Sequence, residues 1–82
     1  MPIFYQLDGF KVYSHLDAAA TERFFAEIRS RGLLPPAGEG RKYASLHRLV
    51  FDGATWSVAI MHLDKSIFID RIVQQRFNPN KE

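Results

Sequence analysis

Histidine is the side chain in this sequence best suited to chemistry near neutral pH, because an imidazole can take up or release a proton there. The chain holds three histidines, His15, His47 and His62. His15 and His62 each begin a His-Leu-Asp triplet that follows an Asp-Gly pair and precedes an apolar run. Two such groups brought together could act as the general acid and base of a small nuclease or hydrolase, or could begin a metal site.

The surroundings of these histidines favour a structural role instead. A zinc site needs at least a third ligand, the chain has no cysteine, and Asp17 and Asp64 stand where each would cap a helix. His47 and Arg48 are consecutive in a strand-like run, so their side chains point to opposite faces. We therefore expect no catalytic residue, no metal and no cofactor. A His-dependent nuclease or hydrolase remains an alternative.

The basic residues raise a second possibility. The net charge is +2, and several arginines fall near the ends of predicted helices, where they complement the helix dipole. The basic residues left over are Lys11, Arg41, Lys42 and Arg48. Interleaved with aromatic side chains on a sheet, such groups can neutralise phosphates and stack bases. The aromatic-rich signature of RRM domains is absent, so nucleic-acid binding through these four residues is kept as an alternative.

The first half of the chain predicts a β-hairpin followed by a helix. Residues 2–7 and 10–16 are rich in aromatic and β-branched side chains and flank an Asp-Gly turn. Asp17 is placed to cap a helix, and Gly32 is placed to end it. The apolar stripe of that helix is predicted at i, i+3, i+4 and i+7, which here are Thr21, Phe24, Phe25 and Ile28.

The second half of the chain is predicted to repeat the same hairpin–helix unit. A connector at about 33–42 leads to strands at 43–51 and 55–62, which flank a second Asp-Gly turn. Asp64 then caps a second predicted helix at 65–77, and 78–82 form a polar tail. We predict one small α+β domain over residues 1–82, with duplicated β-hairpin–helix units (ββαββα). Its four-stranded, mainly antiparallel sheet would carry both helices on one face.

The second predicted hairpin is apolar on both of its faces. Leu49 and Phe51 lie on one side of the strand, and Leu46 and Val50 lie on the other. Two helices on one side of a sheet leave the other side uncovered. We expect that side to be covered by a second subunit or by a partner protein, because exposed apolar patches normally mark interaction sites. A lid formed by residues 33–36 on a monomer is the alternative.

Together these patterns predict a small protein-binding or regulatory domain, of adaptor or inhibitor type and without catalytic activity. We expect it to act as a homodimer or on a protein partner through its apolar, aromatic sheet surface. The predicted contact residues are Tyr43, Phe51, Trp56 and Met61. The lack of cysteine fits the cytoplasm, and neither a signal peptide nor a membrane-spanning run is expected.

Overall fold

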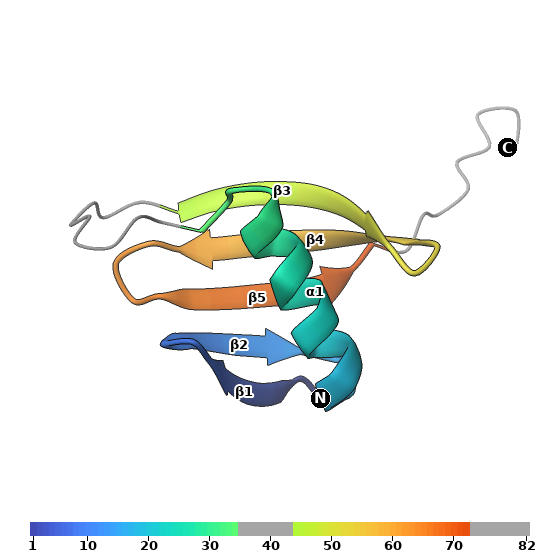
Figure 1. Ribbon diagram of the computed structural model, residues 1–82, viewed down its shortest axis with the longest axis horizontal. Coiled ribbons are helices and arrows are strands. Elements are labelled where there is room, and N and C mark those ends of the chain that lie inside the picture. The colour runs from blue at the N-terminus through green and yellow to red at the C-terminus, as the bar shows by residue number, and fades with distance from the viewer. Residues whose placement is uncertain (35–43, 73–82) are drawn as a thin grey trace, which may run out of the picture.

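The computed structural model describes residues 1–34 and 44–72 (Figure 1). Within these residues, five strands form one mixed sheet, and one helix lies across one of its faces. The strand order is β1-β2-β5-β4-β3, with β2 and β5 parallel and the other neighbours antiparallel. The elements are β1 Ile3–Leu7, β2 Phe10–Ser14, α1 Ala18–Ser30, β3 Ala44–Phe51, β4 Ala54–Met61 and β5 Ser66–Arg71.

The N-terminal hairpin and helix confirm the sequence prediction. Asp8 and Gly9 both have positive φ, 53° and 85°, which is the turn conformation that an Asp-Gly pair favours between antiparallel strands. The Asp17 carboxylate accepts a hydrogen bond of 2.8 Å from the backbone N–H of Ala20 and so caps α1. The four residues of the predicted apolar stripe of this helix are all buried.

The second hairpin is also as predicted. Strands β3 and β4 pair over their whole length, and the turn residues Asp52 and Gly53 have φ values of 53° and 74°. Leu49 is buried against the helix, whereas Leu46 and Val50 are exposed on the opposite side. The expectation of two apolar faces is therefore confirmed for this hairpin.

The predicted second helix and the duplicated fold are wrong. Residues 66–71 form strand β5, inserted between β2 and β4, so the described chain has five strands and a single helix rather than ββαββα. Ile67 and Ile69 point into the core while Phe68 and Asp70 point away, which is the two-residue period of a strand. Asp64 caps nothing, because it lies in the turn between β4 and β5, where Lys65 has a φ of 55°.

The physical reason for the error is the shortness of the run. Six residues rich in isoleucine satisfy a helical stripe and a strand alternation about equally well, and β-branched side chains favour the strand. The position between β2 and β4 then favours the strand over the helix, because it gives the backbone of β5 hydrogen-bonding neighbours on both sides. Most of the predicted connector, the end of the predicted second helix and the polar tail lie outside the described residues.

The core fills the space between α1 and the sheet. Its most completely buried side chains are Val12, Phe24, Ile28, Val58, Ile60, Ile67 and Ile69. The Phe24 ring lies 4.6 Å from the ring of Phe51 and 5.8 Å from that of Trp56, centroid to centroid. Leu33 and Leu34 also pack against this core and not over the other side of the sheet. The described helix is too short and polar to cross a membrane.

Candidate functional site: the uncovered face of the sheet

No described helix covers the side of the sheet turned away from α1 (Figure 1). We call this side the open face. The strand registers place on it every second residue of each strand. Its members are Phe4, Gln6, Lys11, Tyr13, Ala44, Leu46, Arg48, Val50, Thr55, Ser57, Ala59, Met61, Ser66, Phe68 and Asp70.

A continuous apolar row crosses the middle of the open face. Its members are cross-strand neighbours in turn, from β1 to β3: Phe4, Tyr13, Phe68, Ala59 and Leu46. The rings of Tyr13 and Phe68 stack in parallel at 4.9 Å, and Phe4 lies 5.3 Å from Tyr13. Leu46 is 73% exposed, Phe4 50% and Phe68 38%. The sheet thus presents an unbroken apolar line to solvent over all five described strands.

A polar row runs beside the apolar row. Arg48, Ser57 and Asp70 are cross-strand neighbours on β3, β4 and β5, and His15 Nε2 lies 3.5 Å from Asp70 Oδ1. Both members of that pair are well exposed, so the pair contributes little to stability. In the described part of the chain, no carboxylate lies within ion-pair distance of Arg48 or Lys11. Arg48 therefore offers a cation to whatever covers the face.

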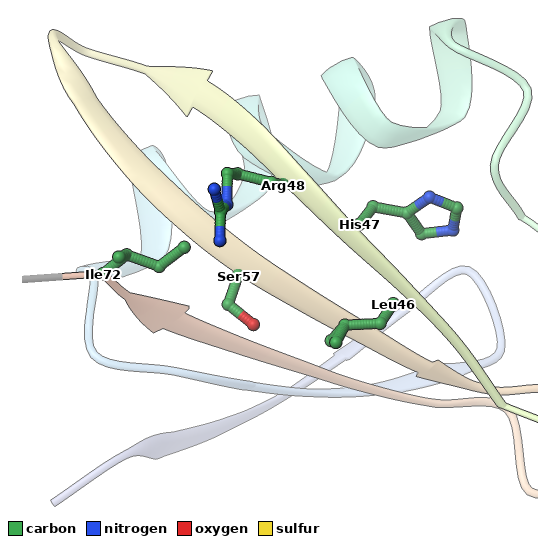
Figure 2. Close-up of a pocket in the computed structure, with 5 residues that line it drawn as sticks. All are labelled: Leu46, His47, Arg48, Ser57 and Ile72. Carbon is green, nitrogen blue, oxygen red and sulfur yellow. The ribbon is translucent and has the colours of Figure 1, made fainter.

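Small residues on β4 leave a hollow between β3 and β5. A shallow pocket of ≈ 230 Å³ lies there, lined by Leu46, His47, Arg48, Ser57 and Ile72 (Figure 2). Ser57 stands between Leu46 and Arg48 on one side and Ile72 on the other, while the His47 ring points away toward the helix side. The hollow combines an apolar wall, a hydroxyl and a guanidinium group, which suits an apolar segment that carries a carboxylate.

Two of the three histidines meet on the other side of the sheet. Ser45 Oγ lies 3.0 Å from the Nε2 of His47 and 3.0 Å from that of the buried His62. One hydroxyl can donate only one proton, so at most one imidazole accepts from Ser45 and at least one donates to it. His15 lies at the other end of β5, since it meets Asp70 while His62 follows the β4 residue opposite Ser66.

The Ser45 cluster joins one hydroxyl to two imidazoles. No group of three or more metal-ligating side chains is found among residues 1–34 and 44–72. Nucleophilic catalysis needs a nucleophile, a base and a third group that orients the base, and the hydrogen bonds of the cluster join the Ser45 hydroxyl to the imidazoles of His47 and His62. Sequence reasoning missed Ser45; the signal was its position two residues before His47, which puts both side chains on one face of β3.

The predicted contact residues are divided between the two faces. Trp56 is buried under α1, and its indole N–H donates a 2.9 Å hydrogen bond to the Phe51 carbonyl oxygen. Phe51 lies on the same side, half-buried, with the Arg23 guanidinium 5.2 Å from the centre of its ring. Met61 is half-buried on the open face, and Tyr43 lies outside the described residues. The apolar row, and not Trp56, supplies the exposed aromatic surface.

The basic residues proposed for nucleic acid do not form one patch in the described structure. Lys11 and Arg48 share the open face but belong to different rows, with β5 and β4 between their strands. Arg41 and Lys42 lie outside the described residues. The arginines of α1 and of its C-cap are paired with acidic groups: Arg23 with Asp52 at 3.3 Å, Arg29 with Asp8, and the C-cap Arg31 with Glu27 at 2.8 Å.

Comparisons with known proteins add no further constraint. No protein family, curated protein or solved structure matches the chain. The geometry of the open face is therefore the basis for a proposal about function.

Proposed function

We propose that this chain is a small protein-binding module that docks other protein surfaces on its open face and has no catalytic role. The observation that carries the proposal is the apolar row, which reaches across the whole sheet while the helix covers only the opposite side. Burying apolar surface contributes about 25 cal/mol per Å². Covering several large exposed side chains therefore offers several kcal/mol towards binding, and exposed apolar patches normally mark interaction sites.

The orientation of the rings favours a protein over a nucleic acid. Neighbouring strands are about 4.8 Å apart, so two nearly parallel rings with centroids 4.9 Å apart must stand upright on the sheet. One face of the Tyr13 ring and one face of the Phe68 ring thus cover each other. Stacking of bases uses exposed ring faces. Upright rings beside aliphatic side chains suit the irregular apolar surface of another protein better.

The charges of the open face support the same choice. The open face carries two cations, Lys11 and Arg48, and one carboxylate, Asp70. Its net positive charge is therefore small. Tight binding of nucleic acid rests on several cations that contact successive phosphates. Adaptor-like action in the cytoplasm completes the proposal, and the absence of cysteine from the sequence is compatible with that reducing compartment.

Site-specific photo-crosslinking in cells that express the chain tests this proposal. A photoreactive amino acid replaces Leu46 on the open face or, as the matched control, the exposed Ala26 on the far side of α1. Protein adducts should form from position 46 and not from position 26. Adding Phe68→Asp to the position-46 variant should abolish them, because a charge is placed in the middle of the apolar row. Equal labelling from both positions, no labelling, or nuclease-sensitive adducts would contradict the proposal.

A further inference from the structure

The seam between β4 and β5 on the open face alternates large and small side chains. Three neighbouring pairs along it are Ser57 with Asp70, Ala59 with Phe68, and Met61 with Ser66. Each pair joins one small residue to one larger residue. Ser66 is only 7% exposed, because it lies between the longer Lys11 and Met61. Along this seam, every projecting side chain therefore has a depression directly beside it.

Consider a twofold axis that runs along the seam, parallel to the strands. It would place each side chain of the seam opposite the second copy's version of the residue with which it pairs across β4 and β5. Phe68 would then rest in the depression above Ala59 of the second copy, and Met61 in the depression above Ser66 of the second copy. Both contacts occur twice by symmetry, as an isologous interface requires. We propose that the occupant of the open face is a second copy of this chain, packed face to face about the β4–β5 seam. This inference rests on the proposed function.

The charges agree with the same axis. Asp70 of the second copy would lie over Ser57, at the hollow that Arg48 lines. There the Ser57 hydroxyl can donate to its carboxylate, and the Arg48 guanidinium supplies the opposite charge. The exposed Leu46 would meet Tyr13 of the second copy, since β2 of one chain covers β3 of the other. Arg48, which has no acidic partner among the described residues, and Leu46, the most exposed described leucine of the open face, both gain partners.

Other placements of the axis fit less well. An axis along the middle of β4 would place small residues over small ones and Leu46 over Phe68, which leaves a void at the centre. An axis along β5 would place Asp70 on Asp70 of the second copy, with like charges in contact. The seam between β4 and β5 avoids the void, and it offsets the two Asp70 side chains by one strand spacing, about 4.8 Å, while it places each of them at the hollow that Arg48 of the other copy lines.

The size of the contact predicts a reversible dimer. The four strands that overlap about this axis span roughly 20 Å by 20 Å from strand spacing and residue rise, about 400 Å² in projection. Counted on both copies this is about 800 Å², which lies below the standard size of stable interfaces and in the range of weak, transient ones. The dimer fraction of the full chain should therefore rise with concentration between micromolar and millimolar when sedimentation equilibrium is measured.

A charge swap tests the register of the two copies. Arg48→Glu and Asp70→Arg each place like charges together across the interface, and each should weaken dimerisation by about tenfold or more. The double variant restores opposite charges and should return the dimer close to the wild-type affinity. Glu22→Arg, on the exposed side of α1, is the matched control and should change nothing. Circular dichroism and thermal unfolding of each variant check that the fold is kept.

A steric swap tests the same axis without charges. Ala59→Phe fills the depression and should abolish the dimer, and combining it with Phe68→Ala should restore part of the affinity, because the projection and the depression are exchanged. A wild-type chain that stays monomeric at millimolar concentration overturns the second copy as occupant. A dimer whose affinity is unchanged by the charge substitutions and by the steric substitutions also overturns it. In either case, crosslinks from position 46 to a different protein would leave the proposed function standing, and their absence would overturn that as well.

Discussion

The two faces of this one sheet use the same strands for different purposes. On the helix side, Val12, Val58, Ile60 and Ile67 are fully buried, and the arginines at the rim are paired with acidic groups. On the open face, the apolar side chains of the same strands are exposed, and Arg48 has no acidic partner in the described chain. Because successive residues of a strand point to opposite sides, one short sequence specifies a core and a contact surface independently.

This comparison teaches that stability and recognition should be separable by mutation. A substitution on the helix side removes packing from a filled core, whereas one on the open face removes side chains that already meet water. Matched pairs of the same residue type on opposite faces make the separation measurable. All stability measurements below refer to dilute solution, where the proposed dimer is dissociated.

The largest difference in the loss of stability is expected between two phenylalanine-to-alanine substitutions, one on each face of the sheet. Phe24→Ala should lower the free energy of unfolding by about 3–5 kcal/mol, because the ring is fully buried against Phe51 and Trp56. That loss is comparable with the whole stability of a small domain. Phe68→Ala should cost about 1 kcal/mol, the contribution of its stacked ring pair with Tyr13. Urea denaturation followed by circular dichroism measures both; equal losses would erase the distinction between the faces.

A second pair lies within a single strand. Leu49 and Leu46 are three residues apart on β3, and they are 6% and 73% exposed. Leu49→Ala should lower the free energy of unfolding by about 2–4 kcal/mol, and Leu46→Ala by no more than about 0.5 kcal/mol. Thermal unfolding of the two variants side by side gives the comparison. A cost for Leu46→Ala as large as that for Leu49→Ala would mean that something within the monomer covers the open face.

The sequence predicts the parts of this fold that local physics determines. Two Asp-Gly turns, the cap at Asp17 and the stripe along α1 follow from short-range rules, and all are present. The strand at 66–71 was missed because its identity depends on insertion between β2 and β4, which lie far apart in the sequence. A six-residue run with three apolar side chains carries too little periodicity to reveal such a non-local partner.

The candidate site follows the same division. The apolar nature of both faces of the second hairpin could be predicted, because alternation within each strand is local. The apolar row could not, since Phe4, Tyr13 and Phe68 become neighbours only through the strand order. Trp56 was expected at a contact surface because it is large and aromatic, but its parity in β4 places it under the helix. Register, which sequence alone did not determine, decides which aromatic side chains are exposed.

The smallest predicted difference in stability is that between the aspartates of the two His-Leu-Asp triplets. Asp17 caps α1, so Asp17→Ala should lower the free energy of unfolding by about 1 kcal/mol through loss of the bond to the Ala20 N–H. Asp64 is exposed in the turn before β5 and caps no helix, so Asp64→Ala should stay within about 0.5 kcal/mol of wild type. The Asp17→Asn variant, which keeps a capping oxygen, should recover most of the loss. Equal losses of unfolding free energy for Asp17→Ala and Asp64→Ala in urea denaturation would contradict this prediction. They would show that the two aspartates have the same structural role, although a helix follows one and a strand follows the other.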